Sequence, residues 1–297
     1  MNDWGTWGPK TDIIGKSLRF TRYGVSALRN THYLVHAPAA LIRLRSVRPL
    51  VRYVDDEQAV VDVHFTLYPL LTIDGSPPPE RPAVEVLVEI DAEEGFHDEG
   101  GCKTRLDEAY RGSVRFDIVR PSRWWPSGLG EQSLYRVSVS VGLPGGAADR
   151  KTVTLGMASV REDTLTNTYN LEQTLLVHGQ VLAIEHLIHV DKISENRLLP
   201  ATGGSLLMVR DHFGTDTLYD AADRAGILLL QCVPIPADDR AFERWVETQV
   251  DRIAPHPSLA GWFVGHLGEM RDDVAERIKT LDPSHAVFRE LPLDPAA

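Results

Sequence analysis

Few residues of this chain have the types and the spacing that carry known chemistry. His186 and His189 stand three apart, but on a strand an odd spacing points two side chains to opposite faces, so a zinc site is not expected. The glycines at 203 and 204 lack the strand, Gly-x-Gly-x-x-Gly and helix context of a nucleotide site. No Gly-x-Ser-x-Gly elbow is present for Ser-His-Asp chemistry. The sequence therefore predicts no metal and no cofactor.

Composition limits the partners that the chain can have. Its 297 residues are 43% hydrophobic and 25% charged, which favours a globular protein of two domains. A net charge of −11 repels phosphate backbones, so a nucleic-acid partner is not expected. No apolar run approaches the roughly 18 residues of a membrane helix, and the first residues carry no export signal. Cys102 and Cys232 are interpreted as free thiols, which predicts a reducing, cytoplasmic location.

The first half of the chain has the pattern of antiparallel strands. Apolar residues alternate with polar ones, which indicates one buried and one wet face, over residues 61–67, 84–90, 114–118 and 135–141. Turn clusters separate these runs at 74–79, 95–101 and 144–146. Several short strands with such punctuation are typical of a β-sandwich. Residues 47–160 suit one Ig-sized domain.

After about residue 170 the spacing of the apolar residues along the sequence changes. Apolar runs at 206–209, 227–233, 259–264 and 286–288 predict strands that are covered on both faces. Between them lie three amphipathic segments: a helix capped by Asp216 and stopped by Gly226, a helix from Asp238 or Asp239 to about 253, and a helix from 270 to 281. Strand–helix alternation of this kind builds a parallel, right-handed sheet.

Several segments, in the right order, resemble glycoside hydrolase family 2, the group of β-mannosidases, β-galactosidases and β-glucuronidases. The clearest is PSRWWPSGLGEQSLY, which is similar to the family's stretch around a Trp-Trp-Pro before the last strands of its Ig-like domain. Residues 155–160 are similar to the exit from that domain, and residues 175–191 to the hairpin that enters the barrel. Three further segments are similar to an R-x-H segment (208–231), an HPS segment (256–270) and an LDP segment (281–288) of the family. Residues 2–23 are similar to the end of the family's jelly-roll domain.

The resemblance implies a multidomain β then α/β fold, in which an Ig-like antiparallel β-sandwich is followed by a partial (β/α) TIM-type barrel. The expected domains are 1–46, a remnant of the jelly-roll sugar-binding domain with a linker; 47–160, the Ig-like sandwich; and 161–297, the N-terminal half of a (β/α)8 barrel. A complete barrel takes about 250 residues, so the chain is expected to lack the seventh strand, on which the family carries its nucleophile.

The family's acid/base glutamate does not align with a carboxylate here. A retaining glycosidase needs two carboxylates about 5–5.5 Å apart. Aligned without a gap from His256, the family's Asn-Glu pair falls on His266 and Leu267, and leucine cannot transfer a proton. Glu269, two residues further on, is the candidate catalytic acid. The alternative is a solvated glutamate in the first turn of the next helix, where the helix dipole favours it.

The resemblance also implies a sugar-binding site, which we expect to include Arg210, His212, Trp262 and His266. Arg210 and His212 follow the second predicted barrel strand, at the end where such barrels carry their sites. The alternatives are an arginine in a salt bridge, a surface histidine and a tryptophan of the core. Leu207 and Ala158 stand where the family has Asn and Arg, which argues against ordinary substrate binding.

A half barrel has open strand edges and an apolar interior that faces water, and proteins usually cover such surfaces. The sequence therefore predicts either a homo-oligomer or a complementing second chain. The leading hypothesis for function is a carbohydrate-active family 2 homologue that lacks standard retaining catalysis and binds glycans or acts in a split assembly. The alternatives are an active β-glycosidase that a partner chain completes, with Glu269 as its acid, and a non-catalytic interaction protein.

Overall fold

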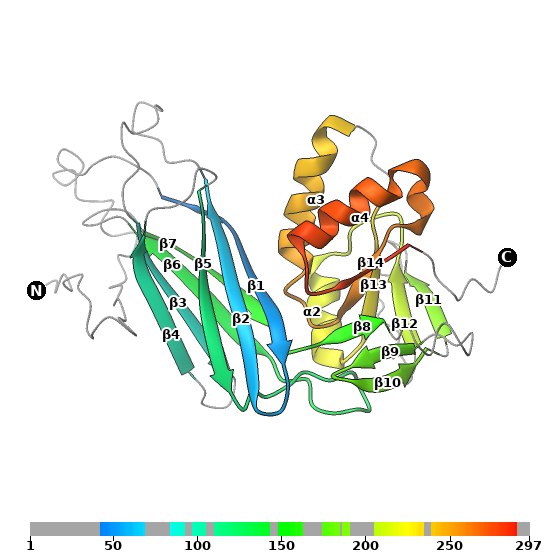
Figure 1. The fold of residues 1–297 in the computed structure, drawn as a ribbon, viewed down its shortest axis with the longest axis horizontal. Coiled ribbons are helices and arrows are strands. Elements are labelled where there is room, and N and C mark those ends of the chain that lie inside the picture. The colour runs from blue at the N-terminus through cyan, green and yellow to red at the C-terminus, as the bar shows by residue number, and fades with distance from the viewer. Residues whose placement is uncertain are drawn as a thin grey trace, which may run out of the picture. The chain divides into compact units, whose positions relative to one another are not determined.

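The computed structural model describes residues 42–68, 84–92, 97–104, 110–142, 148–162, 174–184, 186–190, 205–234 and 239–289 (Figure 1). They form two compact units. The first comprises the described parts of Met1–Pro49, Asp62–Phe116 and Tyr135–Val153, and the second those of Leu50–Val61, Asp117–Leu134 and Thr154–Ala297. Most of the predicted jelly-roll remnant lies outside the described residues. Within these ranges, no helix combines the length and the hydropathy that a membrane crossing requires.

In the described part of the chain before residue 156, seven strands form two sheets. One has the order β1-β2-β5, and the other has the order β4-β3-β6-β7. Their bounds are β1 Leu44–Val54, β2 Gln58–Leu67, β3 Val84–Ala92, β4 His97–Thr104, β5 Arg111–Val119, β6 Tyr135–Gly142 and β7 Ala148–Leu155. β3 pairs antiparallel with both β4 and β6. The four strands predicted from period-two patterns are confirmed as β2, β3, β5 and β6.

The prediction of one wet face holds for β5 but is wrong for β3 and β6. In β5 the residues after 115 alternate between exposed and buried, with Phe116 and Ile118 inside. In β6 seven of the eight residues are buried, including Ser138, whose hydroxyl bonds the Thr152 hydroxyl at 2.9 Å. β3 and β6 are the inner strands of their sheet, where side chains of the strands on both sides flank their own.

The second unit is built on a five-stranded parallel sheet with its strands in chain order. These are β11 His186–Val190, β12 Ser205–Val209, β13 Leu228–Cys232, β14 Leu259–Phe263 and β15 Ala286–Phe288. α2 (Asp216–Ala225), α3 (Asp239–Ile253) and α4 (Arg271–Leu281) connect successive strands from β12 onward. The predicted strand–helix alternation is confirmed. The cap of α2 differs from the prediction, because Thr215 and not Asp216 is the N-cap: its side chain accepts from the Leu218 amide.

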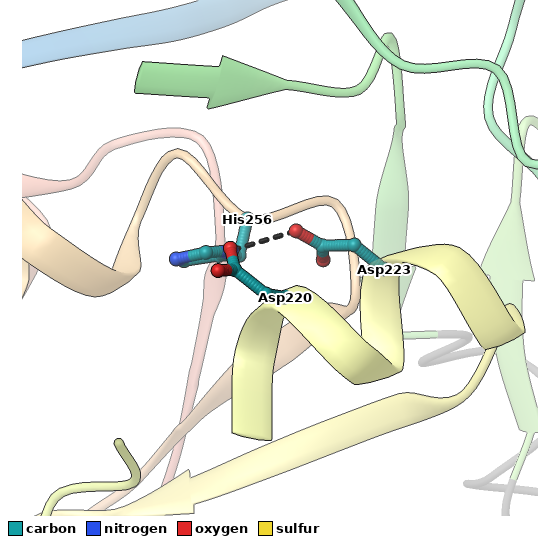
Figure 2. Close-up of side chains that lie close together, drawn as sticks. All are labelled: Asp220, Asp223 and His256. Atoms are coloured by element: carbon teal, nitrogen blue, oxygen red, sulfur yellow. Dashed lines mark hydrogen bonds and ion pairs between the residues drawn. The ribbon is translucent and has the colours of Figure 1, made fainter. Parts of the chain in front are cut away.

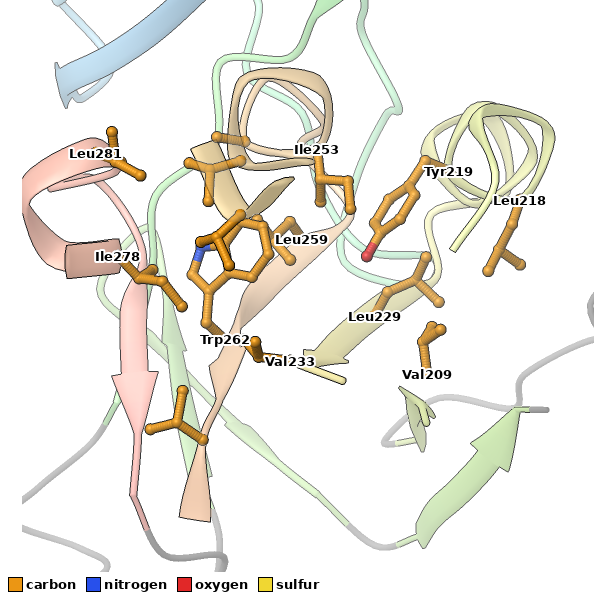
Figure 3. Packing of buried hydrophobic residues seen from close by; sticks show 14 of the residues in the cluster. Val209, Leu218, Tyr219, Leu229, Val233, Ile253, Leu259, Trp262, Ile278 and Leu281 are labelled. Carbon is orange, nitrogen blue, oxygen red and sulfur yellow. The ribbon is translucent and has the colours of Figure 1, made fainter. Parts of the chain in front are cut away.

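One face of this sheet packs against the three helices. Leu229 and Val233 of the β13 region point to this face and share one hydrophobic cluster with Tyr219 of α2, Ile253 of α3 and Ile278 of α4 (Figure 3). Alternate residues of the strands and every third or fourth residue of the helices thus form one shared core. This helix-side core is almost completely buried.

The other face of the parallel sheet is covered, contrary to the prediction of an apolar interior that faces water. A small antiparallel sheet of β8 (Val160–Glu162), β9 (Thr174–Val177) and β10 (Gln180–Ala183) contributes to the same hydrophobic cluster as this face. Leu206, Met208, Leu228, Leu230 and Cys232 lie in that cluster, each at most 4% exposed. Short strands after the sandwich therefore bury the surface that was expected to be open.

Candidate functional site

The carboxyl edge of the parallel sheet brings together most of the residues selected from sequence. In sheets of this class, ligands bind beyond the carboxyl ends of the strands. Arg210 and His212 follow β12, and His266 lies three residues beyond β14. The edge also holds His189 near the end of β11 and Cys232 at the end of β13, two residues for which the sequence suggested no role at such a site.

Arg210 and His212 are held by the segment that joins β12 to α2. The Arg210 backbone amide donates to the Val190 carbonyl at 3.2 Å, and its exposed guanidinium lies 3.2 Å from Nδ1 of His189. His212 Nδ1 donates to the Arg210 carbonyl at 2.6 Å. Between them Asp211 has φ 63°, in the left-handed region, which aspartate tolerates better than most residues with a Cβ. Backbone contacts therefore fix the positions of both predicted sugar-binding residues.

The electrostatics of this edge link His266 and Cys232 to Arg210 and Asp211. Burial is the main cause that lowers the pKa of His266, and the Arg210 charge lowers it further, while the Val233 carbonyl and Asp211 act in the opposite direction. Burial also raises the pKa of the free Cys232 thiol to about 12. At neutral pH, the edge therefore presents a neutral imidazole and a protonated thiol beside one guanidinium.

Leu267, which the gap-free alignment of the sequence pairs with the family's acid, is a buried apolar side chain in the structure. Leu267 is 8% exposed and belongs to the helix-side core. It lies in a 3-10 helix, η3 (Gly265–Met270), and its amide donates to the Val264 carbonyl at 3.0 Å. Glu269 is exposed in the same short helix, directly after Gly268, which has φ 58°. This exposure agrees with the alternative interpretation of Glu269 as a solvated glutamate.

Trp262 lies in the core. Its side chain is 0% exposed, it belongs to the helix-side cluster, and its Nε1 donates to Asp282 Oδ2 at 2.9 Å (Figure 3). Burial alone would raise the pKa of Asp282, but His285 and the hydrogen bonds from His285, Trp262 and Ser284 outweigh it and lower that pKa to about 2. This placement favours the core role for Trp262 that the sequence left open.

Sequence reasoning assigned no role to a polar cluster just before β14. Asp223 of α2, which is 1% exposed, accepts from His256 Nδ1 at 2.6 Å and from the Ser258 hydroxyl at 2.6 Å and amide at 3.1 Å (Figure 2). Asp220 lies close to this network. One potential metal-ligand atom from each of Asp220, Asp223 and His256 lies within 4.8 Å of the other two. Both Asp223 oxygens already accept hydrogen bonds, so the arrangement serves as a structural network. Its sequence signal is the His-Pro-Ser of 256–258.

Comparison with known proteins gives a consistent result. β-Mannosidase A of Aspergillus niger is 31% identical over 216 residues, 59% of this chain, and β-mannosidase A of Neosartorya fischeri is 27% identical over 210 residues, 58% of this chain. The chain spans 22% of the length of each of these relatives. No family model matches the chain.

Solved structures agree on the fold. A β-glucuronidase of Parabacteroides merdae superposes with a TM-score of 0.64 at 12% identity, over 83% of this chain and 34% of that one. A glycosyl hydrolase family 2 member of Bacteroides cellulosilyticus gives 0.62 at 17% identity, over 83% of this chain and 36% of that one. The chain is thus a homologue of glycoside hydrolase family 2 that corresponds to part of the length of those enzymes.

Proposed function

We propose that this chain is a carbohydrate-active family 2 homologue that binds glycans at the carboxyl edge of its parallel sheet and lacks standard retaining catalysis. In this proposal, the seven strands before residue 156 are the family's Ig-like sandwich, and β11 to β15 are the first five strands of its (β/α) barrel. The observation that supports the proposal is the burial of Leu267, the residue onto which the gap-free alignment from His256 puts the family's proton donor.

The chemistry of the edge suits binding better than bond cleavage. Protonation of a glycosidic oxygen needs a carboxylic acid within hydrogen-bond reach. Leu267 has no proton to give, and its side chain belongs to the helix-side core. The exposed guanidinium of Arg210 and the exposed imidazole of His266 offer hydrogen bonds to hydroxyl or carboxylate groups of a sugar. His212 lies beside them, but its Nδ1 donates to the Arg210 carbonyl and its Nε2 is buried.

Hydrolysis and titration together test this proposal. We expect no release of nitrophenol from aryl β-mannoside, β-galactoside or β-glucuronide substrates above the rate of the Glu269→Gln variant. Calorimetric titration with the matching monosaccharides should detect binding. Arg210→Ala should weaken that binding about 10-fold or more, because a charged hydrogen bond contributes roughly 1.5–3 kcal/mol. Arg277→Ala, an exposed arginine of α4, is the matched control and should have no effect.

Two results would contradict the proposal. Hydrolysis that Glu269→Gln abolishes would favour the active glycosidase, with Glu269 as the acid and a partner's carboxylate as the nucleophile. Failure to bind any of the sugars, with a folded chain, would favour a protein that uses the same fold only as an interaction surface.

Self-association and a cytoplasmic location stay predictions. β11 and β15 are the outer strands of the described parallel sheet, and open edges of parallel sheets favour pairing with other strands. We therefore expect light scattering at low micromolar concentration to give a mass above the 33.0 kDa of one chain. A single species of monomer mass in that experiment would contradict the homo-oligomer. It would also contradict the expectation that the open edges of the sheet pair with strands of another chain.

A further inference from the structure

The parallel sheet contains one buried amide side chain that the proposed site does not use. Gln231 lies on β13, a strand whose five described residues are all buried, and it is 0% exposed. Alternation places it on the same face as Leu229 and Val233, toward α2 and away from β8–β10. A buried amide is costly unless its hydrogen-bonding capacity is used, so its partners indicate its role.

All the hydrogen-bonding capacity of this amide is used. Oε1 accepts from the Gly214 amide at 3.0 Å and from the Tyr219 hydroxyl at 2.9 Å. Nε2 donates to the His212 carbonyl at 2.8 Å and to the Cys232 carbonyl at 2.6 Å. The opposite orientation of the amide would put its oxygen against two carbonyls, so the network defines one orientation.

Two of these four bonds reach the backbone of the segment that carries Arg210 and His212. They hold the segment at residues 212 and 214, on either side of Phe213, and Arg252 Nη2 donates to the Gly214 carbonyl at 2.6 Å from α3. The left-handed φ of Asp211 lies within the same segment. Gln231 thus connects the central strand of the sheet to the loop that presents the candidate sugar-binding side chains.

We propose that Gln231 is a positioning residue for this loop, and that it sets where Arg210 meets a ligand without touching that ligand. The effect of Gln231 on ligand binding rests on the proposed glycan-binding function. Its effect on the conformation of the loop does not depend on that function. The loop conformation allows His212 Nδ1 to donate to the Arg210 carbonyl. A carbonyl only accepts, so this bond requires a hydrogen on Nδ1, the less common location in a neutral imidazole.

The test compares the unaltered full chain with Gln231→Leu and with Tyr219→Phe. Nitrogen-15 NMR of the His212 ring reports its tautomer, and amide hydrogen exchange reports the Gly214 bond. The unaltered chain should show the Nδ1–H form. Gln231→Leu should shift the ring toward the Nε2–H form, speed Gly214 exchange at least ~10-fold relative to amides of β13, and weaken sugar binding at least ~10-fold. Tyr219→Phe removes the helix-side bond alone and should leave the tautomer unchanged.

Each outcome decides a separate point. An Nε2–H tautomer in the unaltered chain overturns the inference, and so does a Gln231→Leu variant that keeps both the tautomer and the Gly214 protection. If Gln231→Leu fails to fold, the tautomer of the unaltered chain and slow Gly214 exchange still test the geometry. If the unaltered chain binds no sugar while the tautomer shift occurs, the proposed function fails and the positioning role of Gln231 stands.

Discussion

Replacement of Asp223 by alanine should lower the free energy of unfolding of the second unit by about 3–5 kcal/mol. The carboxylate is 1% exposed and accepts hydrogen bonds from His256 and from both the hydroxyl and the amide of Ser258. Its removal leaves these buried donors without an acceptor, which costs more than the bonds themselves contribute. The backbone carbonyl of Asp223 keeps its bond from Trp124 Nε1, so the loss is confined to the side chain.

Urea denaturation of the two variants Asp223→Ala and Asp220→Ala is the measurement. Asp220 lies one turn earlier on the same helix and is only half-buried, so its replacement should change stability by at most about 0.5 kcal/mol. A loss below about 1 kcal/mol for Asp223→Ala would contradict the structural role of this network. An equal loss for both variants would contradict the assignment of that role to Asp223.

Replacement of Trp262 by alanine should cost about 3–5 kcal/mol, because it empties one of the largest fully buried positions of the helix-side core. Trp262→Phe should cost less but leave Asp282 without its indole donor. This prediction separates the core role of Trp262 from the sugar-stacking role, since a tryptophan that faces ligand would lose affinity on replacement with little loss of stability.

Thermal or urea unfolding followed by circular dichroism measures the effect. Trp245→Ala is the matched control, because Trp245 is 38% exposed and meets Phe213 edge to face with 4.7 Å between the ring centroids. We expect it to cost about 1 kcal/mol. A Trp262→Ala variant as stable as Trp245→Ala would show that Trp262 is not a core residue.

Patterns that are local in sequence predicted most of the second unit. β12, β13 and β14 are short apolar runs, and α2, α3 and α4 follow as amphipathic segments, so periodicity alone located them. β4 was missed because its sequence, HDEGGCKT, is polar and rich in glycine, which is the opposite of strand preference. β4 is held in place by its pairing with β3, and such pairing depends on residues distant in the chain.

The candidate site could be predicted only in part for the same reason. The resemblance located Arg210, His212 and His266 at one edge, but the roles of Gln231 and Asp223 depend on partners 17–35 residues away. A histidine or tryptophan in a buried strand can face either side of the sheet, so the sequence left Trp262 open. The hairpin expected within 175–191 is present as β9 and β10, but the sequence did not predict that it shares a hydrophobic cluster with the parallel sheet, because such packing depends on residues distant in the chain.

The thiol of Cys232 gives this protein a built-in reporter. It is 3% exposed beneath the small antiparallel sheet, and its raised pKa keeps it out of the reactive thiolate form. Alkylating reagents can reach it only when the hydrophobic cluster around it opens. The rate of its labelling therefore measures how often the core around the end of β13 opens.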